Sequence, residues 1–239
     1  MTDQLPLALR WPAHQRFDSF VAGANAAAVE LLRAIAQGGE ESWAYLAGAS
    51  GSGRTHLLVA ACACANAAGR SAQYLSLAAL RTRRAEAIRG FGGSDLLAID
   101  DLDAIAGERE AEHALFDLYN RCRAERASLL FAATAPAAQL GIGLPDLVSR
   151  LSACTQLALK PLDESARRDL LRDRALARGI ELDDAALDWL FARGRRDLAS
   201  LLAALDRIDR ASLASQRRVT VPFLRSLLGK ALDADEKGV

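Results

Sequence analysis

The chain of 239 residues is poor in aromatic side chains, which make up 5% of it, and neither sign of charge is in excess. Lys plus Arg and Asp plus Glu both number 30, and this balance argues against a broad footprint on a nucleic-acid backbone. The N-terminus lacks a basic-then-apolar signal peptide, and no apolar run approaches the length of a membrane span. These absences predict a cytoplasmic protein without membrane contact.

Cysteine is scarce as well. The four cysteines lie in apolar runs, without a C-x-x-C pair or a histidine at metal-ligand spacing: Cys62, Cys64, Cys122 and Cys154. We interpret them as buried, reduced thiols. What the chain does have is hydrophobic residues, at 51%, with many alanines, and this favours closely packed helices over an all-β sandwich.

The stretch from Gly48 to Thr55 reads GASGSGRT and lies between an apolar run at 43–47 and a helical run that starts at His56. Glycines let the backbone curl so that several N–H groups point at an anion, and the helix that follows adds the positive end of its dipole. The motif G-x4-G-K-[ST] has Arg54 in place of lysine and Thr55 at the hydroxyl position for Mg²⁺. The predicted phosphate-binding residues are Gly48, Ser50, Gly51, Ser52, Gly53, Arg54 and Thr55.

Arginine keeps the positive charge but is a planar fork, so we expect nucleotide to bind while transition-state placement suffers. The alternative for this stretch is a glycine-rich turn that binds nothing.

A second apolar strand, 95–99, ends in Asp100 and Asp101. In a parallel sheet, ligands gather at the carboxyl ends of the strands, so Asp100 is expected beside Thr55, where it would hold Mg²⁺ through water. Asp101 would then polarise an attacking water, and Thr134, which ends the strand at 129–133, would sense the outer phosphate. Turn capping explains each of these residues equally well when it is taken alone.

Strands at 43–47, 73–77, 95–99, 129–133 and 156–159 alternate with helices, two of which are expected at 78–89 and 108–127. The pattern predicts an α/β P-loop module with a five-stranded parallel sheet flanked by helices. Beyond Pro161 only helices are expected, at 163–178, 183–193, 195–213 and 222–232. We therefore divide the chain into a terminal peptide and linker at 1–20, an α/β nucleotide-binding domain at 21–160 and a small all-α domain at 161–239.

Four further features have open interpretations. The terminal peptide displays Gln4, Leu5, Leu7 and Leu9, which suits docking into a partner's groove, although the pattern alone favours a frayed terminus or an edge strand. Arg150 lies on a short helix and would ordinarily form a surface ion pair. Arg196 would reach back to phosphate or pair with Asp197. The cluster at Arg81, Arg83 and Arg84 is a solvated face or a DNA contact.

Taken in order, these segments resemble the AAA+ modules of the DnaA replication-initiator clade. The resemblance covers nearly the whole chain and rests on GASGSGRT, LLAIDD, Thr134, the LPDLVSRL segment and the helix start at Arg196. Within the clade, the chain looks closest to the regulatory inactivators of DnaA, through QLPLAL, FDSFVAGAN, DLYNR at 117–121, and LDRIDRAS at 205–212 preceding VTVPF at 219–223.

The resemblance implies an adenine nucleotide, ADP or ATP, with its phosphates on Gly48 to Thr55 and its base near Phe20 and Val21. It further implies that Asp100 and Asp101 form the Walker B motif, that Thr134 and Arg196 are sensors one and two, and that Thr55 and Asp100 hold Mg²⁺ through the nucleotide. Arg150 matches the arginine finger, which enters the site of a neighbouring protomer; in the regulators that neighbour is ATP-bound DnaA. Such a residue supplied in trans can be worth about 10³ to 10⁵ in rate.

In the resembling proteins, Gln4, Leu5, Leu7 and Leu9 fall on the motif that binds the sliding clamp of DNA polymerase III. DNA would then be contacted only through the clamp, at the nucleoid or replisome. A full initiator would continue into a DNA-binding helix-turn-helix, and we expect none here. The implied function is that of a regulator that limits re-initiation of DNA replication. Such a protein would activate a partner's ATPase more than it would hydrolyse ATP efficiently itself. Self-association is left open. The alternatives are a self-standing P-loop ATPase, such as a helicase loader, and a DNA-binding module.

Overall fold

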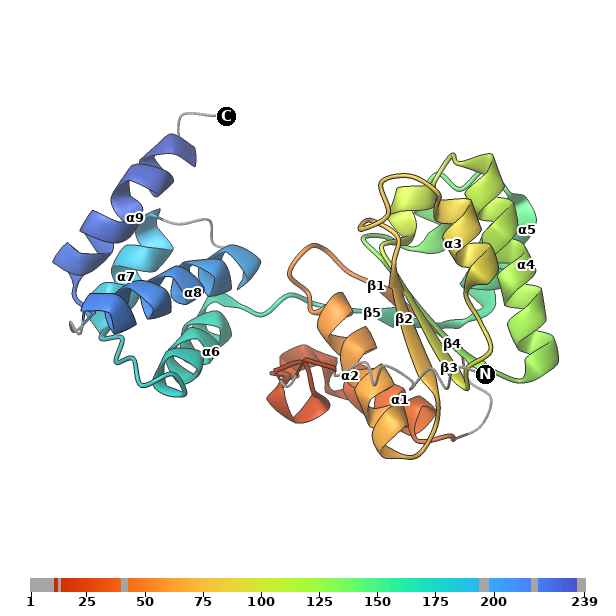
Figure 1. Ribbon diagram of the computed structural model, residues 1–239, viewed down its shortest axis with the longest axis horizontal. Coiled ribbons are helices and arrows are strands. Elements are labelled where there is room, and N and C mark those ends of the chain that lie inside the picture. The colour runs from red at the N-terminus through yellow and green to blue at the C-terminus, as the bar shows by residue number, and fades with distance from the viewer. Residues whose placement is uncertain (1–10, 13, 40–42, 194–197, 216–218, 236–239) are drawn as a thin grey trace, which may run out of the picture. The chain divides into compact units, whose positions relative to one another are not determined.

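The structure is a computed structural model that describes residues 11–12, 14–39, 43–193, 198–215 and 219–235. The chain divides into two compact units, one that extends to Pro161 and one that begins at Leu162. Figure 1 shows strands in the first unit and only helices in the second.

The first unit is built on a five-stranded sheet in the order β2-β3-β4-β1-β5, with every neighbouring pair parallel (Figure 1). The strands are β1 (Ala44–Ala47), β2 (Ala72–Ser76), β3 (Leu96–Asp100), β4 (Ser128–Ala133) and β5 (Thr155–Ala158). Every residue of β3 and β4 is buried, which explains their nearly continuous apolar sequences. The predicted five-stranded parallel sheet is confirmed.

Helices cover both faces of the sheet (Figure 1). One core joins the sheet to α1 (Ala26–Ala36) and α2 (Arg54–Ala67). The other joins it to α3 (Arg84–Gly90), α4 (Arg109–Glu125) and α5 (Pro145–Ala153). Successive residues of β1, Tyr45 and Leu46, point into different cores, as the two-residue period of a strand requires. Short 3₁₀ turns complete the unit: η1 (Phe17–Ser19), η2 (Gly23–Asn25), η3 (Leu102–Ile105) and η4 (Ala137–Gln139).

The helix expected at 78–89 is wrong over its first half. Buried Leu77 is tied to the end of β3, because its N–H donates to the carbonyl of Asp100 at 3.1 Å, and a turn follows it. Arg83 then takes a left-handed conformation with φ of 67°, and α3 begins only at Arg84. Helical periodicity did not reveal this turn because the three arginines of the segment are compatible with a solvated helix face.

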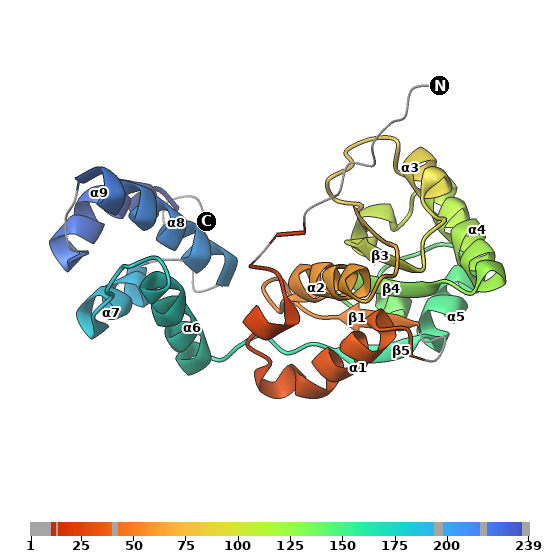
Figure 2. The same cartoon turned by 60° about the horizontal axis from the view of Figure 1, so that its bottom comes forward.

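The second unit consists of α6 (Glu164–Leu176), α7 (Asp184–Arg193), α8 (Leu198–Ser215) and α9 (Val221–Asp235) (Figure 2). Carboxylates cap the first two of these helices: the side chain of Asp163 accepts from the N–H of Ala166 at 2.8 Å, and that of Asp183 from the N–H of Ala186 at 2.7 Å. A separate apolar core forms around buried leucines such as Leu171 and Leu205. The helical second domain predicted beyond Pro161 is confirmed.

A side chain completes one edge of the sheet. The N–H of Leu159 donates to the carbonyl of Ala47 at 2.7 Å and so extends the pairing of β5 with β1. At the next residue, the side-chain amide of buried Asn25 donates to the carbonyl of Lys160 at 2.8 Å and accepts from its N–H at 2.9 Å. The segment that precedes α1 is thereby tied to the chain just before it leaves the first unit.

Candidate nucleotide-binding site

The glycine loop joins the end of β1 to the start of α2, and its backbone requires glycine at several positions. Gly51 and Gly53 have φ of 79° and 93°, in the left-handed region that side chains disfavour. A Cβ atom on Gly48 would lie 2.5 Å from the Ser52 hydroxyl oxygen and 3.0 Å from the carbonyl oxygen of Leu159. The sequence pattern GASGSG therefore matches the conformation of the loop.

Two polar atoms at the start of α2 are buried without a hydrogen-bond partner among the described residues: the Ser52 hydroxyl oxygen and Nη1 of Arg54. Burying such groups without a partner is costly, so each needs a ligand to explain it. Both lie at the N-terminus of a helix, whose dipole favours an anion. The phosphates of a nucleotide would supply the missing acceptors, and the residues present fit such a group.

Thr55 and Asp100 come together as the sequence predicted. The exposed Thr55 donates its hydroxyl to Oδ2 of Asp100 at 2.6 Å. The same oxygen accepts from the Tyr74 hydroxyl at 3.0 Å, and Oδ1 accepts from the N–H of Asp101 at 2.9 Å. Burial raises the pKa of the Asp100 carboxyl, although these hydrogen bonds oppose the shift.

No group of three or more His, Cys, Asp or Glu side chains that could hold a metal by itself occurs in the described part of the chain. A hydroxyl beside a carboxylate fits a hard cation that takes its other ligands from phosphate and water.

Asp101 has a different environment from its neighbour. It takes a left-handed conformation with φ of 59° immediately before η3, and its Oδ2 accepts the Ser76 hydroxyl at 2.8 Å. The two carboxylates of the Asp100–Asp101 pair are therefore held by different residues: Thr55 of α2 and Tyr74 of β2 bind the first, and Ser76, at the end of β2, binds the second.

A third carboxylate, which the sequence analysis missed, joins the site. Asp103 accepts hydrogen bonds from the Thr134 hydroxyl and, at 3.0 Å, from the Thr134 N–H, and its Oδ2 lies 3.8 Å from Nη1 of Arg54. Asp103 thus connects the cation of the glycine loop with the polar residue that follows β4. Its place within the short turn after the aspartate pair was the only sequence signal for this role.

Phe20 lies against the end of the glycine loop. A Cβ atom on Gly53 would fall 2.5 Å from the ring of Phe20, and this ring packs at 5.2 Å against that of His56. Val21 is 37% exposed, which is unusual for a large apolar residue of this protein. Of the two residues expected near the base, Phe20 thus lies beside the glycine loop and the start of α2. Arg196 and the peptide residues Gln4, Leu5, Leu7 and Leu9 lie outside the described residues.

Arg150 belongs to the opposite helical layer. Its guanidinium carbon lies 5.1 Å from the ring centre of Phe116 and 5.2 Å from that of Tyr119, both on α4. Planar guanidinium groups stack well on aromatic faces. The side chain is half-buried, and the printed sequence alone gave no sign of this aromatic support.

The basic cluster that precedes α3 is largely neutralised. Arg83 forms an ion pair with Glu86 at 2.6 Å, and Arg84 forms one with Glu108 at 2.5 Å. Arg84 also donates to the carbonyl of Leu77 at 3.0 Å. These contacts favour a structural role over a nucleic-acid contact.

Among the described helices, none combines the length and hydropathy that crossing a membrane requires.

Family models cover most of the chain. The bacterial DnaA ATPase domain matches residues 12–157, and the lid domain of Hda matches residues 163–228. The two matches meet close to the division between the two units at residue 161.

Solved structures share the fold at low sequence identity. Domain III of the Thermotoga maritima replication initiation protein DnaA has a TM-score of 0.77 at 20% identity, over 92% of this chain and 98% of that one. AMPPCP-bound DnaA from Aquifex aeolicus has a TM-score of 0.67 at 21% identity, over 83% and 66%. The RuvB Holliday junction branch migration motor of Thermotoga maritima has a TM-score of 0.66 at 18% identity, over 92% and 72%. With its glycine loop, its aspartate pair and a helical lid in this order, the chain belongs to the bacterial DnaA ATPase domain family of AAA+ proteins, as an Hda-like member.

Proposed function

We propose that this protein is an adenine-nucleotide-bound adaptor that docks on the DNA sliding clamp and stimulates hydrolysis of ATP bound to DnaA, and so limits re-initiation of replication. Its own nucleotide would stabilise the module, while Arg150 acts on the partner. Membership in the Hda-like branch of a DnaA-related regulator family supports this proposal.

The nucleotide site supports the first part. The Ser52 hydroxyl and Arg54 Nη1 lack hydrogen-bond partners among the described residues and call for phosphate oxygens, and the solved DnaA from Aquifex aeolicus is itself bound to AMPPCP. Thr55 and Asp100 would hold Mg²⁺, which neutralises phosphate charge when it is bound. We place ADP or ATP here with the phosphates on the glycine loop, the base near Phe20 and Val21, and Thr134 and Arg196 as sensors.

The observation that carries the proposal is the environment of Arg150. Its guanidinium is half-buried on the rings of Phe116 and Tyr119, and among the described residues it has no carboxylate partner. Arg150 also hydrogen-bonds the Tyr119 hydroxyl, but a guanidinium has five N–H donors, so donors remain for an oxyanion from another molecule. This is the condition that an arginine finger supplied in trans must meet.

Chemically, Arg150 would act on charge that develops in the partner's site. As the γ-phosphoryl group of DnaA-bound ATP departs, negative charge spreads over its oxygens, and a guanidinium beside them stabilises the transition state. Because Arg150 enters only in the complex, the partner's hydrolysis would depend on this protein. The terminal peptide with Gln4, Leu5, Leu7 and Leu9 would confine that encounter to clamps left on replicated DNA, with no direct DNA contact required.

The test is DnaA ATPase measured with clamp-loaded DNA, with native protein compared with Arg150→Ala. We expect the variant to lose nearly all stimulation while it still binds nucleotide. Equal stimulation by the two proteins would remove the arginine-finger mechanism. A second variant, Leu5→Ala with Leu7→Ala, should lose stimulation when the clamp is required and should no longer be retained on immobilised clamp.

A self-standing P-loop ATPase, such as a helicase loader, is the second candidate. The observation that favours it is the intact pair of Asp100 and Asp101, with Asp101 fixed by the Ser76 hydroxyl. Steady nucleotide turnover by the isolated protein, abolished in Asp101→Asn, would support this function over the regulator. Turnover that stays at background in both proteins would exclude it.

A further inference from the structure

Glu112 is a buried carboxylate that the nucleotide site does not use. It lies in the first turn of α4 and is 2% exposed. A charged side chain is rarely buried so completely unless hydrogen bonds compensate for the lost water. The contacts of Glu112 therefore indicate what the side chain does.

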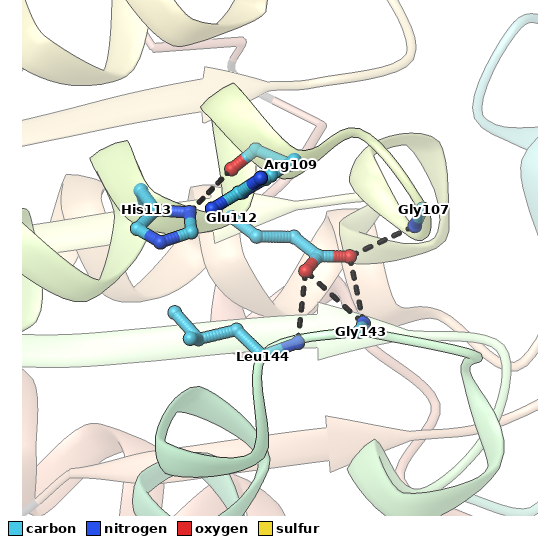
Figure 3. A pocket seen from close by; sticks show the side chains of 6 residues that line it. All are labelled: Gly107, Arg109, Glu112, His113, Gly143 and Leu144. Atoms are coloured by element: carbon cyan, nitrogen blue, oxygen red, sulfur yellow. Dashed lines mark hydrogen bonds between the residues drawn. The ribbon is translucent and has the colours of Figure 1, made fainter.

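Three backbone N–H groups surround the carboxylate, as Figure 3 shows. Gly107 donates to Oε1 at 2.8 Å, Gly143 donates to both oxygens at 3.0 Å, and Leu144 donates to Oε2 at 3.0 Å. Gly107 lies just before α4, whereas Gly143 and Leu144 lie just before α5. One carboxylate thus satisfies backbone donors that lie immediately before two helices, where both dipoles favour negative charge.

Glu112 shares a face of α4 with the two rings that hold Arg150. Glu112, Phe116 and Tyr119 follow one another at helical spacings of four and three residues. The Glu112 carboxylate accepts from the N–H of Leu144 at the start of α5, and the two rings contact the guanidinium of Arg150, which lies in the second turn of α5. One face of α4 therefore makes two contacts with α5: Glu112 holds the start of α5, and Phe116 and Tyr119 hold the Arg150 side chain.

We propose that Glu112 is a positioning residue for Arg150: by tying the start of α5 to that of α4, it sets where the guanidinium stands when a partner's nucleotide approaches. The inference rests on the proposed function. A displacement of about 1 Å in a group that acts on a transition state can cost about a hundredfold in rate, so a single anchor of this kind is enough to govern activity.

The experiment measures the DnaA ATPase rate as a function of the concentration of native protein, Glu112→Gln and Glu112→Asp. Glutamine keeps the shape of the side chain, but its NH₂ group faces backbone donors, so only part of the anchor survives. We expect the maximal stimulated rate to fall about tenfold for Glu112→Gln, while the half-saturating concentration changes less than about twofold. Glu112→Asp keeps the charge on a shorter side chain and should recover part of the rate.

Glu110→Gln is the matched control, because it removes the same charge from the same turn of α4 at an exposed side chain. It should stimulate like native protein. Amide hydrogen exchange at Gly143 and Leu144 should quicken in Glu112→Gln and stay native in Glu110→Gln. Native exchange in Glu112→Gln, or a rise in half-saturating concentration with an unchanged maximal rate, would overturn the inference.

Arg150→Ala separates the two proposals. If Arg150→Ala loses stimulation while Glu112→Gln keeps it fully, the positioning role is wrong and the arginine finger stands. If Arg150→Ala stimulates like native protein, both fail, and the fault lies in the proposed function. If both variants lose rate, the double variant should be no slower than Arg150→Ala alone, because Glu112 would act only through Arg150. A slower double variant would indicate general damage to the fold and would also overturn the inference.

Discussion

Nη1 of Arg54 lies 3.8 Å from the carboxylate of Asp103, and the same carboxylate accepts hydrogen bonds from the N–H and hydroxyl of Thr134. We propose that Arg54 and Thr134 contact the outer phosphates of the nucleotide. In the structure the Asp103 carboxylate already interacts with both residues. An additional phosphate would have to compete with that carboxylate for them. The third aspartate of the segment is therefore expected to influence how many phosphates the site prefers.

Asp103→Asn tests this expectation. The amide keeps an acceptor for Thr134 but removes a negative charge beside the outer phosphates, where like charges repel. We predict that affinity for a non-hydrolysable ATP analogue rises about tenfold relative to affinity for ADP, measured by calorimetric titration with both ligands. Asp117→Asn, at an exposed position of α4, is the control and should leave the ratio unchanged. An unchanged ratio in Asp103→Asn would show that Asp103 does not discriminate between the ligands.

Asp100→Asn should stabilise the nucleotide-free protein while it weakens Mg²⁺-dependent nucleotide binding. Burial disfavours the ionised carboxyl, as its raised pKa indicates. In the variant, Nδ2 can donate to the hydroxyl oxygens of Thr55 and Tyr74, and Oδ1 can still accept from Asp101. We expect the free energy of unfolding to rise on the order of 1 kcal/mol at neutral pH, as seen by chemical denaturation. A destabilised variant would contradict this account of the charge.

The same group predicts a pH dependence. The pKa of Asp100 is higher in the folded state than its ordinary value of 3.8, so the protonated carboxyl favours folding. The free energy of unfolding of native protein therefore falls as pH rises through the raised pKa and the carboxyl ionises. The gap in unfolding free energy between native protein and Asp100→Asn should therefore be largest at neutral pH and should close as pH falls below 3.8. Denaturation curves at several pH values measure it. A gap that widens in acid would rule this origin out.

Arg150→Lys should behave almost like Arg150→Ala in the DnaA ATPase assay. Lysine keeps the charge but lacks the planar group that stacks on Phe116 and Tyr119 and the paired donors that match a phosphate. We predict that at least about nine-tenths of the stimulation is lost, with unfolding free energy within about 1 kcal/mol of native. Full activity of the lysine variant would mean that charge alone is sufficient at this position.

The cysteines should differ strongly in reactivity. Burial raises the pKa of the Cys62 thiol to about 12 and those of Cys122 and Cys154 to about 11, whereas Cys64 is only half-buried. The thiolate is the reactive species, so iodoacetamide at pH 8 should modify Cys64 at least about tenfold faster than the other three. Timed mass spectrometry of the folded protein reads this order. Equal rates would contradict the buried positions of the other thiols.

The sequence was informative wherever chemistry was local. The run LLAIDD ends a fully buried strand, and Gly51 and Gly53 take conformations that glycine favours, so the strand, the glycine loop and the Thr55–Asp100 pair followed from residue order and parallel topology. The helical content of the second unit likewise followed from periodicity.

Contacts between distant segments were beyond that reasoning. Asp103 meets Thr134, and Glu112 meets Gly143, only because the loops after β3 and β4 converge, and no periodicity encodes the distance between two loops. The support of Arg150 by Phe116 and Tyr119 depends on how α4 and α5 pack. The turn before α3 was misjudged for a related reason, since Leu77 is held by the backbone of Asp100 rather than by its own neighbours in sequence.

The two hydrogen bonds between Asn25 and Lys160 have a consequence for solubility. Leu159 faces β1, so the backbone groups of Lys160 face the open side of the sheet, where a sixth strand could otherwise add. The carboxamide of Asn25 presents one donor and one acceptor, as a peptide group would, and occupies that place. A single side chain thus blocks edge-to-edge growth of the sheet at this point and lowers the risk that separate molecules join through their strands.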